Sequence, residues 1–166
     1  WKDLLICEWI ALSVLREAGI ETMEASLHQI KGVTFLEGVR FDRLGAKGRC
    51  AVLSLAAIDH FHFGVHDNWA ETAMRLETSR LFSREDAQKL RLIEAFSRLI
   101  GDTDRHFHNI SVYPESPKSS LNQPFYRLAP AFDKLPMLFA PISGQIVNRE
   151  FLLPIPVSNL FDVWPQ

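Results

Sequence analysis

The chain has 166 residues, 47% of them hydrophobic, and a formal net charge of -2, which is enough for one hydrophobic core. A pI near 6.3 without runs of Lys or Arg argues against a nucleic-acid-binding surface in this segment. Two cysteines, Cys7 and Cys50, are too few for a disulfide framework, and no apolar run reaches the ~20 residues of a membrane span, so we expect a cytoplasmic protein.

The N-terminal part of the sequence predicts one helix followed by a β-hairpin. Apolar residues recur at helical spacing over residues 3–18. Residues 24–30 and 33–41 read as strands around a Lys-Gly pair at 31–32, a plausible hairpin turn. Because the chain opens with Trp1 and enters a helical pattern at once, we expect further sequence to precede it.

A group of histidines lies in residues 59–66, where His60, His62 and His66 are interspersed with phenylalanines. Neutral imidazole is a common zinc ligand, so this spacing invites a metal-site interpretation. However, no cysteine or additional carboxylate stands at zinc-finger spacing. A half-exposed turn or strand is therefore the favoured prediction for this segment.

Two further helices are predicted before the richest motif of the chain. One begins at Asp67 or Asn68 and runs to about Leu81. The next covers residues 84–100 and follows a variant capping box at 83–86, in which Asp takes the place of the usual Glu or Gln. Its apolar residues recur every three or four positions, so this helix can anchor the loop after it to the core.

The C-terminal third predicts one more hairpin and an irregular tail. Residues 110–113 and 125–129 read as paired strands, and the Pro/Ser/Asn-rich segment 114–124 between them favours a mobile surface loop. Beyond Asp133 the prolines are frequent enough to disfavour long regular elements. The hairpin is expected to bring the residues before and after it together.

The densest group of reactive side chains lies at residues 101–109 (GDTDRHFHN). Asp104 can orient a hydroxyl or accept its proton, while Asn109 and Asp133 offer hard oxygen ligands for magnesium. Each residue alone would read as a turn or cap residue. Their spacing together favours phosphoryl transfer, which needs a carboxylate near the acceptor and metal ligands near the phosphates.

These residues resemble the HipA-like serine/threonine kinases of bacterial toxin-antitoxin systems. The similar motifs are residues 102–111 (DTDRHFHNIS), 128–133 (LAPAFD) and 40–43 (RFDR), the last at the family's nucleotide-binding hinge. The resemblance runs over about residues 1–156.

The sequence also departs from the family pattern at four positions. Asp102 stands where Asn is more usual, and His108 where a small residue is common. In addition, Val39 replaces the hinge Glu and Phe132 replaces Tyr. None of these changes removes a catalytic group that the resemblance implies.

The resemblance implies an α+β, protein-kinase-like catalytic lobe, mainly helical with short β-hairpins. It would occupy residues 1–166 as a single kinase region, with its hinge near 39–43 and the N-terminal nucleotide-binding part before the chain. ATP and Mg²⁺ are the implied cofactors. Asp104 would be the catalytic residue, and Asn109 and Asp133 the ligands of metal and cofactor. No glycine-rich phosphate loop or ATP-binding Lys precedes the first helix, so this segment alone is expected to be inactive.

Several other roles are less sharply defined by the sequence. Arg40, Phe41 and His106 are implied nucleotide-binding residues. His106 could orient the loop or meet the nucleotide phosphates, and a purely structural histidine that is hydrogen-bonded to the backbone is an equal alternative. Arg105 could neutralise phosphate or pair with a neighbouring acid. Glu8 occupies the first helix, where kinases keep a Glu that pairs with a phosphate-binding Lys, but a solvated Glu8 is the favoured interpretation.

The resemblance also suggests partners and leaves rival functions open. The implied substrate is a protein, and some relatives act on an aminoacyl-tRNA synthetase. A DNA-binding antitoxin or a fused DNA-binding domain is the implied partner. A metal-dependent phosphohydrolase, in which Asp102, Asp104 and His106 direct water, is one alternative. The other is a degenerate kinase lobe that binds a partner without catalysis.

Overall fold

The structure is a computed structural model that describes residues 2–115 and 125–164. Its helices are α1 (Lys2–Glu17), α2 (Leu55–His62), α3 (Trp69–Thr78) and α4 (Arg84–Leu99). Its strands are β1 (Ala25–Ile30), β2 (Val33–Gly38), β3 (Arg43–Leu44), β4 (Gly48–Arg49), β5 (Leu53–Ser54), β6 (Ser111–Glu115) and β7 (Phe125–Leu128). Short 3-10 turns are η1 (Phe107–Asn109), η2 (Met137–Phe139) and η3 (Ser158–Leu160).

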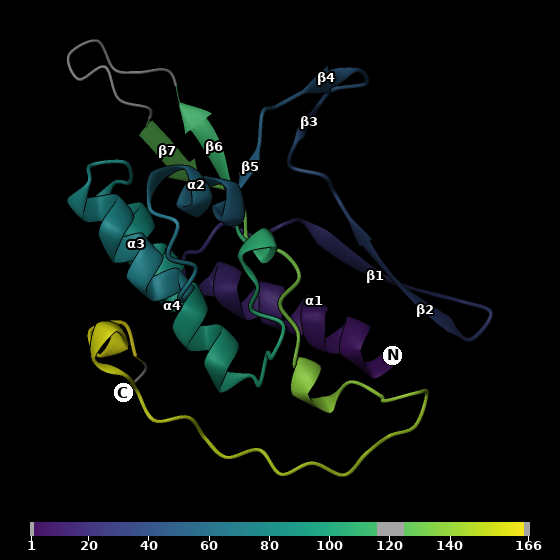
Figure 1. The fold of residues 1–166 in the computed structure, drawn as a ribbon. Coiled ribbons are helices and arrows are strands. Elements are labelled where there is room, and N and C mark those ends of the chain that lie inside the picture. Colours follow the sequence, from purple (N-terminus) through teal and green to yellow (C-terminus); the bar gives the residue numbers. More distant parts are fainter. Residues whose placement is uncertain (1, 116–124, 165–166) are drawn as a thin grey trace.

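The predicted first helix and hairpin are confirmed as α1, β1 and β2. The two strands pair antiparallel, with Ile30 opposite Val33. The intervening Lys31 and Gly32 have φ of 52° and 81°, the left-handed conformations that a two-residue hairpin turn requires. Figure 1 shows the hairpin alongside α1 and reaching out beyond the helices. The second strand ends at Gly38, earlier than predicted, and the chain then continues towards the hinge segment.

The prediction of a turn or strand at residues 59–66 is wrong for residues 59–62, which belong to helix α2, whereas residues 63–66 form the turn and loop after it. The side chain of Ser54 caps the helix by accepting a hydrogen bond from the Ala57 N–H. Buried Leu55 and Ile58 then lie at helical spacing on one face. His60 and Phe61 are exposed, whereas His62 is half-buried and Phe63 packs against the core, so the alternation in the sequence does not correspond to two faces of a strand.

The histidines of this region have partners other than a metal. His62 Nε2 lies 3.0 Å from the Tyr126 hydroxyl, and His66 Nδ1 lies 3.5 Å from the buried Asp59 carboxylate. Within residues 2–115 and 125–164, no group of three His, Cys, Asp or Glu side chains is placed to hold a metal ion. These contacts join α2 to the sheet and to the start of α3.

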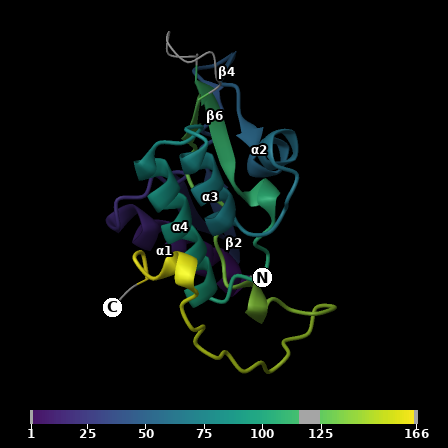
Figure 2. The ribbon, with the colours of Figure 1, turned by 60° about the vertical axis from the view of Figure 1, so that its left-hand side comes forward.

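Helices α3 and α4 begin at side-chain caps. Asn68 Oδ1 accepts from the Glu71 N–H, and Ser83 Oγ accepts from the Asp86 N–H, each at 3.0 Å. The predicted helices are therefore confirmed, with α3 ending at Thr78. Figures 1 and 2 show α3 and α4 side by side.

The main core joins these helices to the three-stranded sheet, whose order is β5-β6-β7 with antiparallel pairing. The core residues are apolar and almost wholly buried; among them are Leu15, Leu55, Trp69, Leu76, Leu90, Ile93, Val112 and Leu128. The segment between α4 and β6 is therefore fixed at both ends to one core, as the stripe on α4 predicted. This segment is residues 100–110, which include the candidate catalytic residues.

The chain after β7 is largely irregular, as predicted, except for η2 and η3. Leu160 in η3 packs against Ala70 and Ala95, which returns the tail to α3 and α4. The predicted loop at 114–124 lies almost entirely outside the described residues. In the part of the chain that the structure describes, no helix combines the length and apolar character needed to cross a membrane.

Candidate active site

The loop that follows α4 is shaped by Gly101 and Asp102. Gly101 has a φ of 73°, a left-handed conformation that side chains disfavour, and it lets the chain leave the helix. Asp102 is only 1% exposed, and its Oδ1 accepts a hydrogen bond from the Asp104 N–H at 2.9 Å. This contact holds the backbone that presents Asp104.

Asp104 and Asn109 lie together at the two ends of this loop. Asp104 has a half-exposed carboxylate, whereas Asn109 is 6% exposed. The Asn109 Nδ2 donates to the Asp104 carbonyl at 3.0 Å. Because this hydrogen bond uses the amide nitrogen, the amide oxygen of Asn109 is left to bind another group.

Lys134 links the backbone of Asp133 to that of Asn109. The Lys134 side chain is fully buried, and its Nζ donates to the carbonyls of Asn109 and Asp133 at 3.4 and 3.2 Å. Nζ also lies 4.7 Å from the centre of the Trp69 ring, a cation–π arrangement. These contacts link the backbones of Asp104, Asn109 and Asp133, although 29 positions separate the first from the last in the sequence.

The Lys134 ammonium lies among several carboxylates. Burial lowers the pKa of the Lys134 ammonium, and the charges of Asp102 and Asp133 oppose that effect. Burial raises the pKa of the Asp102 carboxyl, which the Asp104 N–H and the Lys134 charge partly offset. The sequence shows a lysine directly after Asp133, a predicted magnesium ligand, but it does not show that this lysine is buried.

Glu8 is part of this environment, so the interpretation of Glu8 as a solvated residue is wrong. It is half-buried, and its carboxylate lies beside the backbone of Asp133. Burial raises the pKa of Glu8, and the neighbouring Asp133 charge raises it further. The first helix therefore contributes a carboxylate to the region where sequence analysis placed only loop residues.

An apolar pocket of about 440 Å³ adjoins the site on the side of the predicted hinge. Its lining residues come from the hinge, the sheet and the segment before Asp133; they are Met23, Arg40, Phe41, Asp42, Val52, Ser111 and Phe132. The rings of Phe41 and Phe132 lie 5.6 Å apart, and the Tyr113 hydroxyl donates to the Phe41 carbonyl at 3.1 Å. The predicted Arg40 and Phe41 therefore share one pocket next to Asp133.

A second, charged pocket of about 490 Å³ lies at Asp104. Its lining comes from the start of α3, the end of α4 and the loop; it consists of Asp67, Asn68, Glu94, Arg98, Thr103, Asp104, Arg105 and His106. His106 Nε2 is 3.8 Å from Asp104 Oδ1, and Arg105 Nε is 3.7 Å from the buried Glu94. His106 thus lines the pocket of Asp104, whereas Arg40 and Phe41 line the other.

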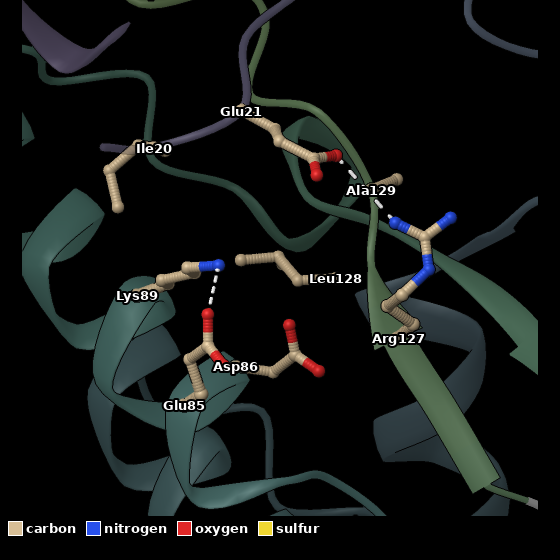
Figure 3. A pocket seen from close by; sticks show the side chains of 8 residues that line it. All are labelled: Ile20, Glu21, Glu85, Asp86, Lys89, Arg127, Leu128 and Ala129. Carbon is tan, nitrogen blue, oxygen red and sulfur yellow. Dashed lines mark ion pairs between the residues drawn. The ribbon is translucent and has the colours of Figure 1, made fainter. Parts of the chain in front are cut away.

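A third pocket, of about 250 Å³, lies away from these residues (Figure 3). Its charged side chains pair with each other: Lys89 with Glu85 at 2.6 Å, and Arg127 with Glu21 at 3.6 Å. None of the predicted site residues lines it.

Comparisons with solved structures identify the fold. The HipA toxin of Shewanella oneidensis, solved with HipB and operator DNA, matches 82% of this chain and 35% of its own, with a TM-score of 0.62 and 15% identity. The proinflammatory kinase CtkA of Helicobacter pylori matches 76% of this chain and 44% of its own, with a TM-score of 0.53 and 16% identity. The predicted α+β, kinase-like fold is confirmed.

Comparisons at the sequence level identify the family. Toxin YjjJ of Escherichia coli is 36% identical over 149 residues, which cover 89% of this chain. The chain spans about a third of that relative's length, 32%. The family described as the HipA-like C-terminal domain matches residues 1–153. The chain therefore belongs to the HipA-like C-terminal domain family.

Proposed function

We propose that the protein transfers the terminal phosphoryl group of ATP to a serine or threonine hydroxyl of another protein, as a HipA-like toxin kinase. The observation that carries the proposal is the arrangement of the three predicted residues between two pockets. Asp104 lines the charged pocket, and Asp133 directly follows Phe132, a wall of the apolar pocket. This separation supports in-line transfer, in which the acceptor oxygen attacks the terminal phosphorus of ATP on the side opposite the leaving ADP oxygen.

Each residue has a surrounding suited to its proposed role. The half-exposed Asp104 carboxylate is accessible to an acceptor hydroxyl, whose proton it would orient or accept. The amide oxygen of Asn109 and the Asp133 carboxylate are hard donors that suit Mg²⁺, which when bound neutralises charge on the phosphates. The flat faces of Phe41 and Phe132 suit an adenine ring, with Arg40 at the same pocket.

The partners proposed for this chain follow its relatives. One is called a toxin, and another was solved with HipB and operator DNA. A DNA-binding antitoxin or a fused DNA-binding domain is therefore the proposed partner, and a cytoplasmic protein, such as an aminoacyl-tRNA synthetase, the proposed substrate class. DNA contact by this segment itself is not part of the proposal, because its pI of 6.3 gives no basic footprint.

The test is to supply the complete protein with ATP labelled at its terminal phosphate, together with bacterial lysate proteins as acceptors. Label on serine or threonine is the expected result. Asp104→Asn should abolish labelling, because the amide keeps the shape of the side chain and removes the carboxylate. Asp3→Asn, the same change on the exposed first turn of α1, is the matched control and should label as the wild type does.

Two outcomes would reject the proposal, and a third would reject the role of Asp104. Release of free phosphate without labelled protein would indicate the phosphohydrolase alternative. If the assay yields no labelled protein and no free phosphate, the protein is a lobe that binds a partner without catalysis. Labelling by Asp104→Asn at the wild-type rate would show that Asp104 is not the catalytic residue.

A further inference from the structure

Glu94 is a carboxylate inside the protein that the proposed chemistry does not use. It lies on α4 directly after the core residue Ile93, and it is only 2% exposed although it lines the charged pocket. Its Oε1 atom faces two guanidinium groups, with Arg98 Nε at 2.7 Å and Arg105 Nε at 3.7 Å. A buried carboxylate is strongly unfavourable unless cations or hydrogen bonds compensate its charge, and these two arginines do so.

The two arginines differ in the segments that they connect to Glu94. Arg98 lies four positions further along the same helix, so its hydrogen bond with Glu94 stays within α4. Arg105 belongs to the loop and directly follows Asp104. Its Nη1 atom also donates to the Asp102 carbonyl, so one guanidinium group contacts both the helix and the first part of the loop. The Glu94–Arg105 ion pair therefore links α4 to the residue next to the proposed catalytic carboxylate.

The backbone of Asp104 is consequently held on both sides. Its N–H donates to Asp102 Oδ1, and its carbonyl accepts from Asn109 Nδ2. The residue after it, Arg105, is held by Glu94. Because Arg105 turns towards Glu94, it makes no ion pair with Asp104 in the part of the chain that the structure describes, and the Asp104 carboxylate stays half-exposed.

We propose that Glu94 is a positioning residue for phosphoryl transfer, which acts through Arg105 to hold the loop that presents Asp104. This role rests on the proposed function, because it assumes that Asp104 orients the acceptor hydroxyl. Displacing a catalytic group by ~1 Å can slow a reaction about 100-fold, so a loop released from α4 would transfer phosphate slowly. Nucleotide binding should not change, because Glu94 and Arg105 line the charged pocket and not the apolar one.

The first measurement is hydrogen exchange of the complete protein, which requires no activity. Glu94→Gln keeps the shape of the side chain and removes its charge, whereas Arg105→Met removes the guanidinium group and keeps most of the stem. Each variant should make the amides of residues 102–109 exchange several-fold faster and leave those of α4 nearly unchanged. Glu85→Gln is the matched control, because Glu85 pairs with Lys89 at 2.6 Å on the same helix but is exposed.

Phosphoryl transfer by the same variants separates positioning from a purely structural role. Glu94→Gln and Arg105→Met should each lower kcat at least ~10-fold, while the Kd for Mg-ATP stays within about twofold of the wild-type value. Because both changes remove one contact, the double variant should be no slower than the slower single variant. Arg105→Lys keeps a cation opposite Glu94 and should recover part of the rate, whereas Glu85→Gln should match the wild type.

Unchanged exchange of residues 102–109 in both variants would overturn the proposal. Losses of kcat that multiply in the double variant would also overturn it, because Glu94 and Arg105 would then act independently. A Kd for Mg-ATP that rises in step with the loss of kcat would show a general structural effect and overturn the positioning role.

Two further cases are decided by the same measurements. If Glu94→Gln does not fold, Arg105→Met and Arg105→Lys decide, since they change a side chain that is 30% exposed on the loop. If the wild type transfers no phosphate, the proposed function fails, whereas hydrogen exchange still shows whether Glu94 and Arg105 hold the loop.

Discussion

Asp133 has a φ of 55°, which places it in the left-handed region that few residues other than glycine adopt easily. Asp and Asn tolerate this conformation better than other side chains do. The conformation allows the chain to pass from Phe132, in the apolar pocket, to Lys134, in the core, within two residues. Residue 133 therefore lies where the chain passes from the proposed nucleotide pocket into the core.

Asp133→Asn is a clean test of the proposed metal role, because Asn keeps the left-handed backbone while it removes the charge. We expect both Mg²⁺-dependent nucleotide affinity and phosphoryl transfer to fall by at least ~10-fold. Added Mg²⁺ should restore part of the loss, since a weakened ligand raises the metal concentration required. Calorimetry of nucleotide binding and a transfer assay at several Mg²⁺ concentrations measure the two effects separately.

Comparison with Asp104→Asn provides the control for that experiment. Asp104→Asn should lose transfer and keep nucleotide affinity, because it alters the acceptor side only. An Asp133→Asn variant with unchanged nucleotide affinity and unchanged Mg²⁺ dependence would contradict the assignment of Asp133 as a metal ligand.

At the scale of the elements, the start of α3 is fixed by an ion pair beside the charged pocket. Two nitrogens of Arg75 donate to the Asp67 carboxylate at 2.8 and 2.7 Å. These hydrogen bonds lower the pKa of Asp67 from 3.8 to about 2. Because Asp67 also lines the pocket at Asp104, the same pair holds one wall of the proposed acceptor site.

This pair should contribute to stability in a defined pH range. The folded-state pKa of Asp67 lies below its unfolded value, so the contribution is present above pH 3.8 and is lost as the pH falls towards 2. Asp67→Asn should cost about 1 kcal/mol at pH 7 after solvent screening, and progressively less as the pH falls below 4. Denaturant unfolding from pH 7 to 2.5 measures this, and a loss independent of pH would contradict it.

Elements with strong local signals were predictable from the sequence, and those without them were not. The cap at Ser83 and the apolar stripe of α4 define that helix within a few residues, and the turn at 31–32 defines the first hairpin. Helix α2 is only eight residues long, too short for its period to stand out among histidines and phenylalanines. Its identity depends on the buried contacts of Leu55 and Ile58, which are tertiary.

The candidate site was also predictable from the sequence only in part. Asp104, Asn109 and Asp133 could be selected from spacing and from the family resemblance, and in the structure hydrogen bonds of Asn109 and Lys134 link their backbones. Lys134 could not be recognised as part of the site, because its burial against Trp69 depends on a contact between segments 65 positions apart. Glu8 was missed for a similar reason, since α1 reaches Asp133 only in the folded chain.

At the scale of the whole molecule, the described chain is about a third of the length of its curated relative. In protein kinases the strongest phosphate contacts come from a glycine-rich loop and a lysine, and these 166 residues contain no glycine-rich loop of that kind. We expect this 166-residue chain alone to bind Mg-ATP at least ~10-fold more weakly than the complete protein, since a charged hydrogen bond contributes roughly 1.5–3 kcal/mol.

Calorimetry on the chain and on the complete protein measures that difference directly. Circular dichroism of the isolated chain is the necessary control, because an unfolded segment would also bind weakly. Equal and tight binding by both would show that the whole nucleotide site lies within these residues, contrary to the kinase-lobe interpretation.

The burial of Lys134 also constrains how this site can change over evolutionary time. Its ammonium lies in the core, between the carbonyls of Asn109 and Asp133 and against the Trp69 ring. A short side chain at this position would leave a cavity, whereas a long apolar one can fill the same volume without a buried charge. Relatives that lack the lysine should therefore have a residue of similar length, such as Met, at this position.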